Sequence, residues 1–405
     1  MNTRPKRERQ PYHLPRAAAI AVYALPAAIT VLFYVLHSRA SVMDWVSTHV
    51  SAPARGVLGL FSSVFPFSLM EILIAAAVIW AACYIVRTIT VAARRGDFSG
   101  RRGSSRSRNV SRRHEKLAFV SRRLLTVIIV ALYIWSLFCW LWNSGYHAPG
   151  FAAKYGFAGG GVSRADLTAT AWIFAAKANE LAPLVARDED GGYIGDRRDF
   201  FSASTSVFDG LTSEFPSLGG RLYKPKPMLF SWLMSRTGYT GIYFALTGES
   251  NINTSAPLFL MPATVAHELA HQRGVFAEDE ANFAGIAACV TSGNMVYEYA
   301  GSLMGLMYLL NALATEDIDA WAEIGSELCA EVNRDWQDNY EYWEAQKKVE
   351  TGVGIIDSVL TAVTEKVSDT VDSVYDGYLK SQNQELGLRS YGACVDLLVE
   401  FFHNS

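Results

Sequence analysis

Three long apolar segments in the first third of the chain restrict its architecture more than any other feature. They span residues 17–36, 69–86 and 124–142. Each is close to the roughly 20 residues that a helix needs to cross the hydrocarbon core of a bilayer. The first follows a basic stretch, as in a signal peptide, but it exceeds the roughly 7 to 15 apolar residues of a signal h-region. The sequence therefore predicts three transmembrane helices, the first of which is a retained anchor.

The loops between these segments differ strongly in charge. Residues 87–123 carry twelve Arg and Lys against two acidic residues, whereas the loop after the first segment has only Arg39 and Arg55. Cytoplasmic loops of membrane proteins are enriched in Lys and Arg. We therefore expect a multi-pass protein of the cell membrane, with its N-terminus and the 87–123 loop in the cytoplasm and everything after Trp142 outside.

The charge distribution also argues against nucleic acid as a partner. Residues 143–405 hold 17 Lys and Arg against 34 Asp and Glu, a net formal charge of −17, although the whole chain is at −3. The basic loop 87–123 could bind nucleic acid, but a basic loop between two membrane segments is more often attracted to anionic lipid. The predicted partner is thus the lipid bilayer. The predicted domains are a membrane anchor, residues 1–142, and an extracytoplasmic domain, residues 143–405.

The extracytoplasmic domain is predicted to be largely helical, with a small β-hairpin or edge sheet. Apolar residues recur at helical spacing over 165–182, whereas 187–220 is polar and rich in Gly, Ser and Asp, which indicates a long surface loop or lid. Residues 238–260 contain two β-favouring runs, Ile242–Leu246 and Leu258–Leu260, so we expect a hairpin there. Further helices are expected over residues 262–273, 278–291, 295–314, 316–348, 353–382 and 390–402.

One of these helices, Met295–Ala314, is apolar enough to be a fourth membrane span. It contains Glu298 near its start and Asn311 near its end, and its neighbours are amphipathic with acidic faces. We therefore favour a buried core helix. If it did cross the membrane, residues 316–405 would be cytoplasmic and separated from the residues discussed next.

The chain carries an HExxH motif within the sequence TVAHELAHQRGVFAEDEAN, residues 264–282. His267 and His271 fall one helical turn apart on one face, where both imidazoles can reach a single metal ion, and Glu268 borders the same place. By chance the motif arises on the order of once per hundred chains of this length. Gly274 fits the end of this helix, and Glu278 fits the positively polarised start of a second one.

A catalytic zinc ion has three protein ligands and an open position for water. A third histidine ligand is improbable, because the outer domain otherwise has only His147 beside the membrane and His403 at the chain end. Glu278 and Glu280 are the candidates, but two helical positions differ by about 200°, so both cannot face the ion. We favour Glu278, because Asn282 then falls four residues later and can support a ligand histidine.

The HELAH sequence followed by E-D-E-A-N resembles the gluzincin metallopeptidases, whose third ligand is the first Glu of an ExxAD or ExxSD helix. Asn282 stands where that family has Asp, and the loop between the helices is shorter than in thermolysin-like enzymes. The chain is more similar to an uncharacterised bacterial family of three-span membrane proteins. That resemblance covers roughly residues 220–310 and 374–396, through KPMLFSWL, GESNIN, LMPATVAHELAHQRG, EDEANF and YLKSQNQELGLRSYG.

A zinc peptidase site would also need groups that handle protons and hold the substrate. Glu268 would take the proton of a zinc-bound water and deliver it to the leaving amine. GESNIN, with Glu249, Asn251 and Asn253, is predicted to be an edge strand that pairs with an extended peptide, although an ordinary hairpin turn fits equally well. The donor to the oxyanion is expected to be a Tyr or Arg: Tyr391, Arg389 or Tyr297.

The sequence thus favours a membrane-anchored zinc peptidase that acts on peptides, envelope proteins or cell-wall crosslinks. The alternative is a non-catalytic, zinc-stabilised envelope receptor or interaction protein. Glu268 favours the enzyme, because a structural site has no use for a proton acceptor beside an open position. An intramembrane protease is disfavoured, because HELAH lies far from every predicted span. The oligomeric state does not follow from the sequence.

Overall fold

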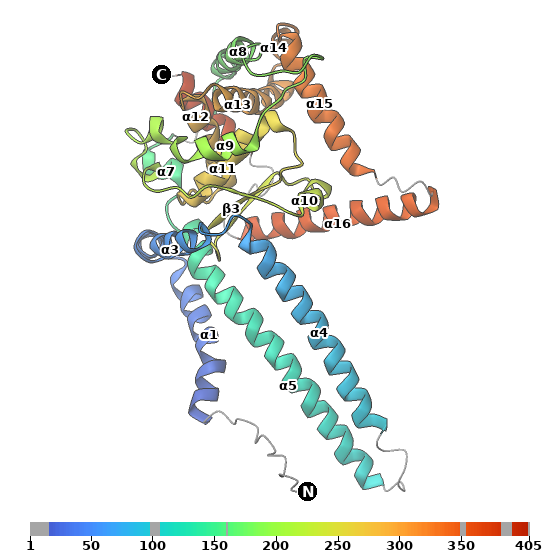
Figure 1. The fold of residues 1–405 in the computed structure, drawn as a ribbon. Coiled ribbons are helices and arrows are strands. Elements are labelled where there is room, and N and C mark those ends of the chain that lie inside the picture. The colour runs from blue at the N-terminus through green and yellow to red at the C-terminus, as the bar shows by residue number, and fades with distance from the viewer. Residues whose placement is uncertain (1–15, 98–105, 159–160, 349–353, 382–390, 404–405) are drawn as a thin grey trace, which may run out of the picture. The chain divides into compact units, whose positions relative to one another are not determined.

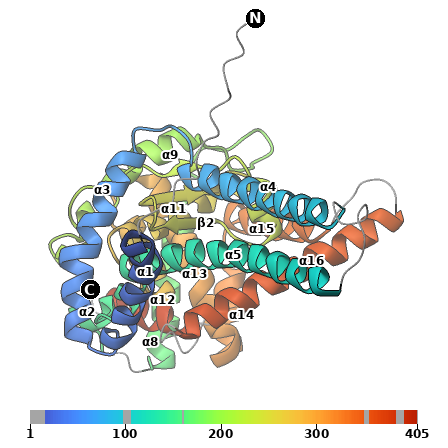
Figure 2. The ribbon, with the colours of Figure 1, turned by 90° about the horizontal axis from the view of Figure 1, so that it is seen from below.

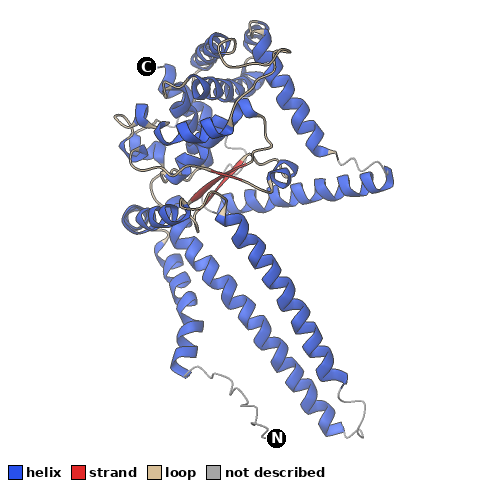
Figure 3. Cartoon of the chain, in the orientation of Figure 1, coloured by secondary structure: helices blue, strands red, loops and turns tan. Residues whose placement is uncertain are grey.

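Helices make up most of the structure, and the strands are few and short (Figure 3). The prediction of a mainly helical protein is therefore confirmed. The chain forms two compact units: residues 1–38 with 79–140, and residues 39–78 with 141–405. The second unit thus takes in residues 39–78 as well as the predicted outer domain. The computed structural model describes residues 16–97, 106–158, 161–348, 354–381 and 391–403.

In the first unit, α1 (Arg16–Leu36) packs against α5 (Arg106–Phe138). Pro26 lies inside α1, and because it has no N–H, the carbonyl of Val22 one turn earlier loses its helical donor. The hydroxyl of Tyr133 on α5 donates to that carbonyl at 3.0 Å. A neighbouring helix therefore supplies the hydrogen bond that the proline removes from α1.

Two described helical stretches are long and apolar enough to cross a membrane, Leu69–Ala93 and Leu117–Tyr146. The first lies in α4 (Leu69–Asp97). The second lies in α5 and its continuation, which consists of the π-helical turn η2 (Cys139–Asn143) and the short helix α6 (Ser144–Tyr146). The apolar part of α1 that qualifies is only Ala24–Leu36, which at about 1.5 Å per residue is shorter than the core of a bilayer. The structure thus supports two of the three predicted spans.

The predicted cytoplasmic loop 87–123 contains much more helix than expected. α4 continues to Asp97 and α5 begins at Arg106, while residues 98–105 lie outside the described residues. The physical reason is that Arg and Lys are good helix formers, so a basic segment without Pro extends the helices on both sides.

The second unit begins with a chain of short helices ahead of α4. These are α2 (Ala40–Val46), the π-helical turn η1 (Ser47–Ser51) and α3 (Ala52–Ser62). Pro53 stands in the first turn of α3, directly after the π-helical turn η1. Figure 2 shows α2 and α3 following one another along one side of this unit.

The main hydrophobic core of the second unit lies between five helices (Figure 1). One of them, α13, includes Tyr297 and Leu303 among its buried residues, so the predicted core helix is observed. Close packing depends on Gly305, where a Cβ would lie 2.2 Å from the ring of Phe174 on the neighbouring helix. The five helices are α8 (Arg164–Leu181), α11 (Met261–Gln272), α12 (Glu278–Val290), α13 (Met295–Glu316) and α17 (Tyr391–His403).

Residues 187–220 are not the surface loop or lid that their polar composition predicts. They form α9 (Arg197–Ala203) and three short 3-10 turns, Ser204–Ser206, Asp209–Leu211 and Pro216–Leu218. Their apolar residues are few but large, and Phe200, Phe208 and Phe215 are all buried in the core. The aromatic side chains therefore outweigh the polar residues around them.

The predicted helix 316–348 is two helices, α14 (Ile318–Ser326) and α15 (Ala330–Lys347). The side chain of Asn179 on α8 donates to the carbonyl of Glu327 and accepts from the N–H of Cys329. This bridge satisfies backbone groups at the break, which a sequence pattern cannot reveal. Beyond α15 follows α16 (Gly354–Ser381).

The small sheet has the strand order β1-β3-β2, so β3 is its central strand. β3 (Glu249–Ile252) runs antiparallel to β2 (Gly241–Phe244) and parallel to β1 (Lys226–Pro227). The predicted hairpin exists, but its second strand comes earlier than expected. The turn closes at Gly248, whose φ of +68° suits glycine, and Leu258–Leu260 forms a 3-10 turn instead of a strand.

Candidate metal centre

The two histidines of the motif lie one turn apart on α11, as predicted. The helix begins after Leu260 with Pro262 in its first turn, and it ends in a reversal at Gly274, whose φ is +86°. The N–H of Val275 donates to the carbonyl of Ala270 across this reversal. The chain can therefore turn at once into α12, which starts four residues after Gly274.

Glu278, the first residue of α12, faces both imidazoles. One of its carboxylate oxygens, Oε2, lies 3.3 Å from Nε2 of His267 and 3.6 Å from Nε2 of His271. The ligand atoms of all three side chains lie within 4.8 Å of one another. A tetrahedral zinc ion with bonds of about 2.0–2.1 Å separates its ligand atoms by roughly 3.3 Å, so the three groups fit one ion.

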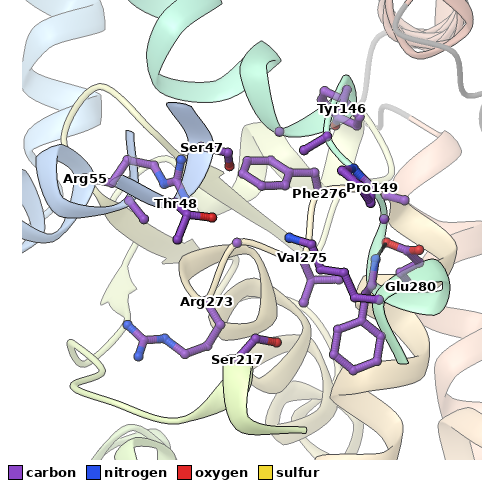
Figure 4. A pocket seen from close by; sticks show the side chains of 18 residues that line it. Ser47, Thr48, Arg55, Tyr146, Pro149, Ser217, Arg273, Val275, Phe276 and Glu280 are labelled. Carbon is purple, nitrogen blue, oxygen red and sulfur yellow. Dashed lines mark hydrogen bonds between the residues drawn. The ribbon is translucent and has the colours of Figure 1, made fainter. Parts of the chain in front are cut away.

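Glu280, the alternative third ligand, points elsewhere. Its carboxylate accepts hydrogen bonds from the N–H groups of Phe151 (2.8 Å) and Ala152 (2.9 Å), at the start of the short helix α7 (Phe151–Tyr155). It lines a separate cavity of about 240 Å³, with Arg55 on another side (Figure 4). The geometry therefore brings Glu278 and not Glu280 to the histidines.

The charges at this cluster depend on one another. Burial would raise the pKa of Glu278, but the two imidazoles hold that pKa well below its usual value. Burial would likewise lower the pKa of His271, but the Glu278 carboxylate raises it to about 9. The raised pKa of His271 therefore favours a proton on this imidazole, beside the Glu278 carboxylate. A metal ion bound by the same atoms would take the place of that proton.

Glu268 is a buried carboxylate next to the cluster. Only 5% of its surface is exposed, and its Oε2 atom has no hydrogen-bond partner among the described residues. Burial raises the pKa of Glu268, and the two histidines oppose this only in part. The backbone of β2 passes close by, since a Cβ on Gly241 would lie 2.5 Å from Oε1 of Glu268. The site thus holds a buried carboxylate, that of Glu268, which can accept a proton.

The two histidines differ in the hydrogen-bond partner of their Nδ1 atoms. Nδ1 of His271 lies 2.7 Å from the carbonyl of Val275, which fixes the proton on Nδ1 and leaves Nε2 free to bind an ion. Nδ1 of His267 is buried and has no partner among the described residues. Asn282, predicted to support one of them, makes no hydrogen bond to either in the described part of the chain.

The predicted substrate strand is wrong in its position, because β3 is paired on both sides. The three polar side chains that the prediction named are also buried, and each makes hydrogen bonds within the protein. The carboxylate of Glu249 accepts from the N–H groups of Leu69 and Met70, so it caps the start of α4. The amide of Asn251 donates to the carbonyl of Glu249, and that of Asn253 donates to Ser235 and to the carbonyl of Tyr239.

Of the three predicted oxyanion donors, the structure describes the side chain of Tyr297. Tyr391 begins α17, but its side chain and Arg389 lie outside the described residues. Tyr297 is buried in the core, and its hydroxyl donates to the carbonyl of Phe200 at 2.8 Å. This contact indicates a structural role for Tyr297 in the core and argues against a role at the metal centre.

The structure adds a residue that the sequence did not suggest, Tyr375 on α16. Its hydroxyl donates to Oε1 of Glu278 at 2.6 Å. Its ring lies 6.0 Å from that of Tyr239, whose hydroxyl donates to Asp372 on α16 at 3.2 Å. In the view of Figure 1, α16 runs below α10 (Ser231–Arg236). Only the tyrosine spacing within VYDGY could have drawn attention to it.

The fold and the site define a mainly helical protein with two candidate membrane-spanning helices and a His-His-Glu cluster that could hold a metal ion. The chain belongs to the family described as a protein of unknown function, DUF3810, whose family model matches residues 47–399. The predicted membership of an uncharacterised family is thereby confirmed. No curated protein and no solved structure matches the chain.

Proposed function

We propose that this protein is a membrane-anchored zinc peptidase that hydrolyses peptide bonds. The observation that carries the proposal is the buried Glu268 carboxylate, whose Oε2 atom has no hydrogen-bond partner among the described residues, beside the ligand atoms of His267, His271 and Glu278. Two neutral imidazoles and one carboxylate are a common ligand set of catalytic zinc. A purely structural site gains nothing from a second buried carboxylate with an unsatisfied oxygen.

The residues of the site divide the chemistry between them. A zinc ion held by His267, His271 and Glu278 would polarise a water molecule and the scissile carbonyl. Glu268 would accept the proton of the attacking water and then deliver it to the leaving amine. Tyr375 orients the Glu278 carboxylate through its hydroxyl, and Tyr391 stays the predicted donor to the oxyanion.

β2, an edge strand, is the better candidate for the strand that pairs with an extended peptide. The strand order leaves β2 at an edge, and its backbone at Gly241 passes the carboxylate of Glu268. A peptide added to this edge would bring its backbone to the proton acceptor. We therefore assign to β2 the substrate-pairing role that the sequence analysis assigned to GESNIN.

Gly241→Ala tests this close approach. The new Cβ would meet Oε1 of Glu268 at 2.5 Å and its Cγ at 2.7 Å, so the carboxylate must move. We expect turnover to fall by about 100-fold, because misplacing a reacting group by about 1 Å can cost that much. Zinc content should stay near wild type. Gly325→Ala is the control, since a Cβ there meets nothing within 4 Å and α14 should tolerate it.

The proposed topology keeps the first apolar segment as a third span, with the N-terminus and the 87–123 loop in the cytoplasm. A protease added to intact spheroplasts should then digest residues after 142 and spare the basic loop, because only the former are outside. Epitope tags at both places report the result. Digestion of the basic loop with protection of the later residues would reverse the orientation.

The function itself is tested with the full-length protein in detergent. Metal analysis after dialysis should find about one zinc per chain, and digestion of a broad peptide library should yield fragments that vanish with a chelator and return with zinc. Stoichiometric zinc without any cleavage would favour the zinc-stabilised interaction protein over the enzyme.

A further inference from the structure

The surface of α3 is apolar where a water-facing helix would be polar. Val57, Leu60 and Phe61 recur at i, i+3 and i+4, so they share one helical face, and Val64 follows in the turn just after the helix. Val57 is 67% exposed, Phe61 63% and Val64 76%. The opposite side of the helix packs into the second unit through Arg55, Gly59 and Ser62. The apolar face therefore points outward.

A second exposed apolar segment lies beside the same part of the chain. Leu229, Phe230, Trp232 and Leu233, at the start of α10, are all exposed. The carboxylate of Glu71, in the first turn of α4, accepts from the N–H groups of Leu229 (2.9 Å) and Phe230 (2.8 Å). The start of α10 is thereby fixed to the start of α4.

Lys226 connects the segment before α10 to the end of α3. Its ammonium group donates to the carbonyls of Ser62 and Phe65, at the end of α3. The two apolar segments therefore flank the first turn of α4 together. We call them the apolar collar, which consists of Val57, Leu60, Phe61, Val64, Phe67, Leu229, Phe230, Trp232 and Leu233.

The chain itself indicates what covers the collar. Leu69, two residues after Phe67, is the first residue of a stretch apolar enough to cross a membrane. A surface attached to the first turn of such a helix lies at the level where the helix enters the bilayer. Aromatic and large apolar side chains are favoured there, because the interface accepts them without exposing them to water.

We propose that the apolar collar lies in the interfacial layer of the bilayer from which α4 starts. The second unit would then rest on the membrane surface instead of extending from it on a linker. Other exposed apolar residues of this unit, such as Ile173 and Trp321, lie on α8 and α14, which share no hydrogen bonds with the start of α4 among the described residues.

This position has a consequence for substrates, which rests on the proposed peptidase function. Glu249 caps the first turn of α4, and the hydroxyl of the next residue, Ser250, donates to the carbonyl of Glu268 at 2.9 Å. One strand therefore connects the metal helix to the start of the candidate span. The peptide bonds within reach of Glu268 would lie just outside the bilayer, in membrane-proximal segments of anchored proteins or peptides.

The collar is tested with fluorescent probes on full-length protein in lipid nanodiscs. Single cysteines replace Phe61, Val64 or Trp232, with Ile173→Cys and Trp321→Cys as controls, after Cys83→Ser and Cys329→Ser remove the accessible native thiols. Each cysteine carries an environment-sensitive dye, and the nanodiscs contain lipids with a quencher near the headgroup. Matching thermal unfolding curves select variants that keep the fold.

We expect roughly twofold or stronger quenching at Phe61, Val64 and Trp232 and none at the controls, because an interfacial face enters the headgroup region by about 5–10 Å. Equal quenching at collar and control positions would overturn the proposal. So would a collar that is quenched only by a water-soluble quencher, since its partner would then not be lipid.

The substrate consequence is tested with lipid-anchored peptides on the same nanodiscs. One set has a spacer of about 6 residues between anchor and cleavable segment, about 20 Å when extended, and the other has about 20 residues, about 70 Å. A site at the membrane surface should cleave both at similar rates. Cleavage of only the long-spacer peptides would place the site far from the bilayer and overturn the inference. If no peptide is cleaved, even without an anchor, the peptidase proposal fails while the probe result stands.

Discussion

Glu268→Gln is expected to reduce peptide cleavage by at least the roughly 100-fold to 10,000-fold that a positioned acid or base contributes. The substitution keeps the shape of the side chain and removes the proton acceptor. Glu268 is the buried carboxylate whose Oε2 has no partner among the described residues, so the amide breaks no hydrogen bond there. Initial rates on a peptide that the wild type cleaves, measured at saturating zinc, give the effect.

The same variant should bind zinc as the wild type does, because Glu268 is not one of the three ligands. Its thermal stability should be equal or slightly higher, since a buried carboxylate is replaced by a neutral group of similar size. Unchanged cleavage in the variant would refute the proposed mechanism. Loss of zinc would instead make Glu268 a ligand and the site a closed, structural one.

The local part of the site could be predicted from sequence because helical geometry fixes it. His267 and His271 share a face through their spacing alone, and the phase of α12 separates Glu278 from Glu280 by about 200°. Gly274 marks where α11 must end. These inferences need only a few neighbouring residues, and the structure places the side chains accordingly.

The remaining contacts join residues that are far apart in the chain, and no local pattern specifies them. Tyr375 reaches Glu278 across 97 positions, and Glu249 reaches the start of α4 across about 180. For the same reason β3 looked like an edge strand, because its partner β1 is only two residues long and begins with Lys226. The sequence 187–220 looked like a lid because its buried aromatic residues are widely spaced.

Glu278→Gln should remove most of the bound zinc, whereas Glu280→Gln should not. The first substitution puts a neutral amide in place of the only negatively charged ligand, so affinity should fall by more than the roughly 10-fold to 100-fold typical of losing an outer partner of a metal ligand. The neighbouring variant is a matched control on the same turn of α12. Competition with a chelator of known affinity, followed by metal analysis, compares the two.

Glu280→Gln should have a different and smaller effect. Its carboxylate accepts from the N–H groups of Phe151 and Ala152 at the start of α7, and an amide oxygen can replace only part of that interaction. A modest loss of thermal stability with full zinc content is therefore expected. If zinc were lost from the Glu280 variant and kept by the Glu278 variant, the phase of α12 would be wrong. The cluster of His267, His271 and Glu278 would then not be the metal centre.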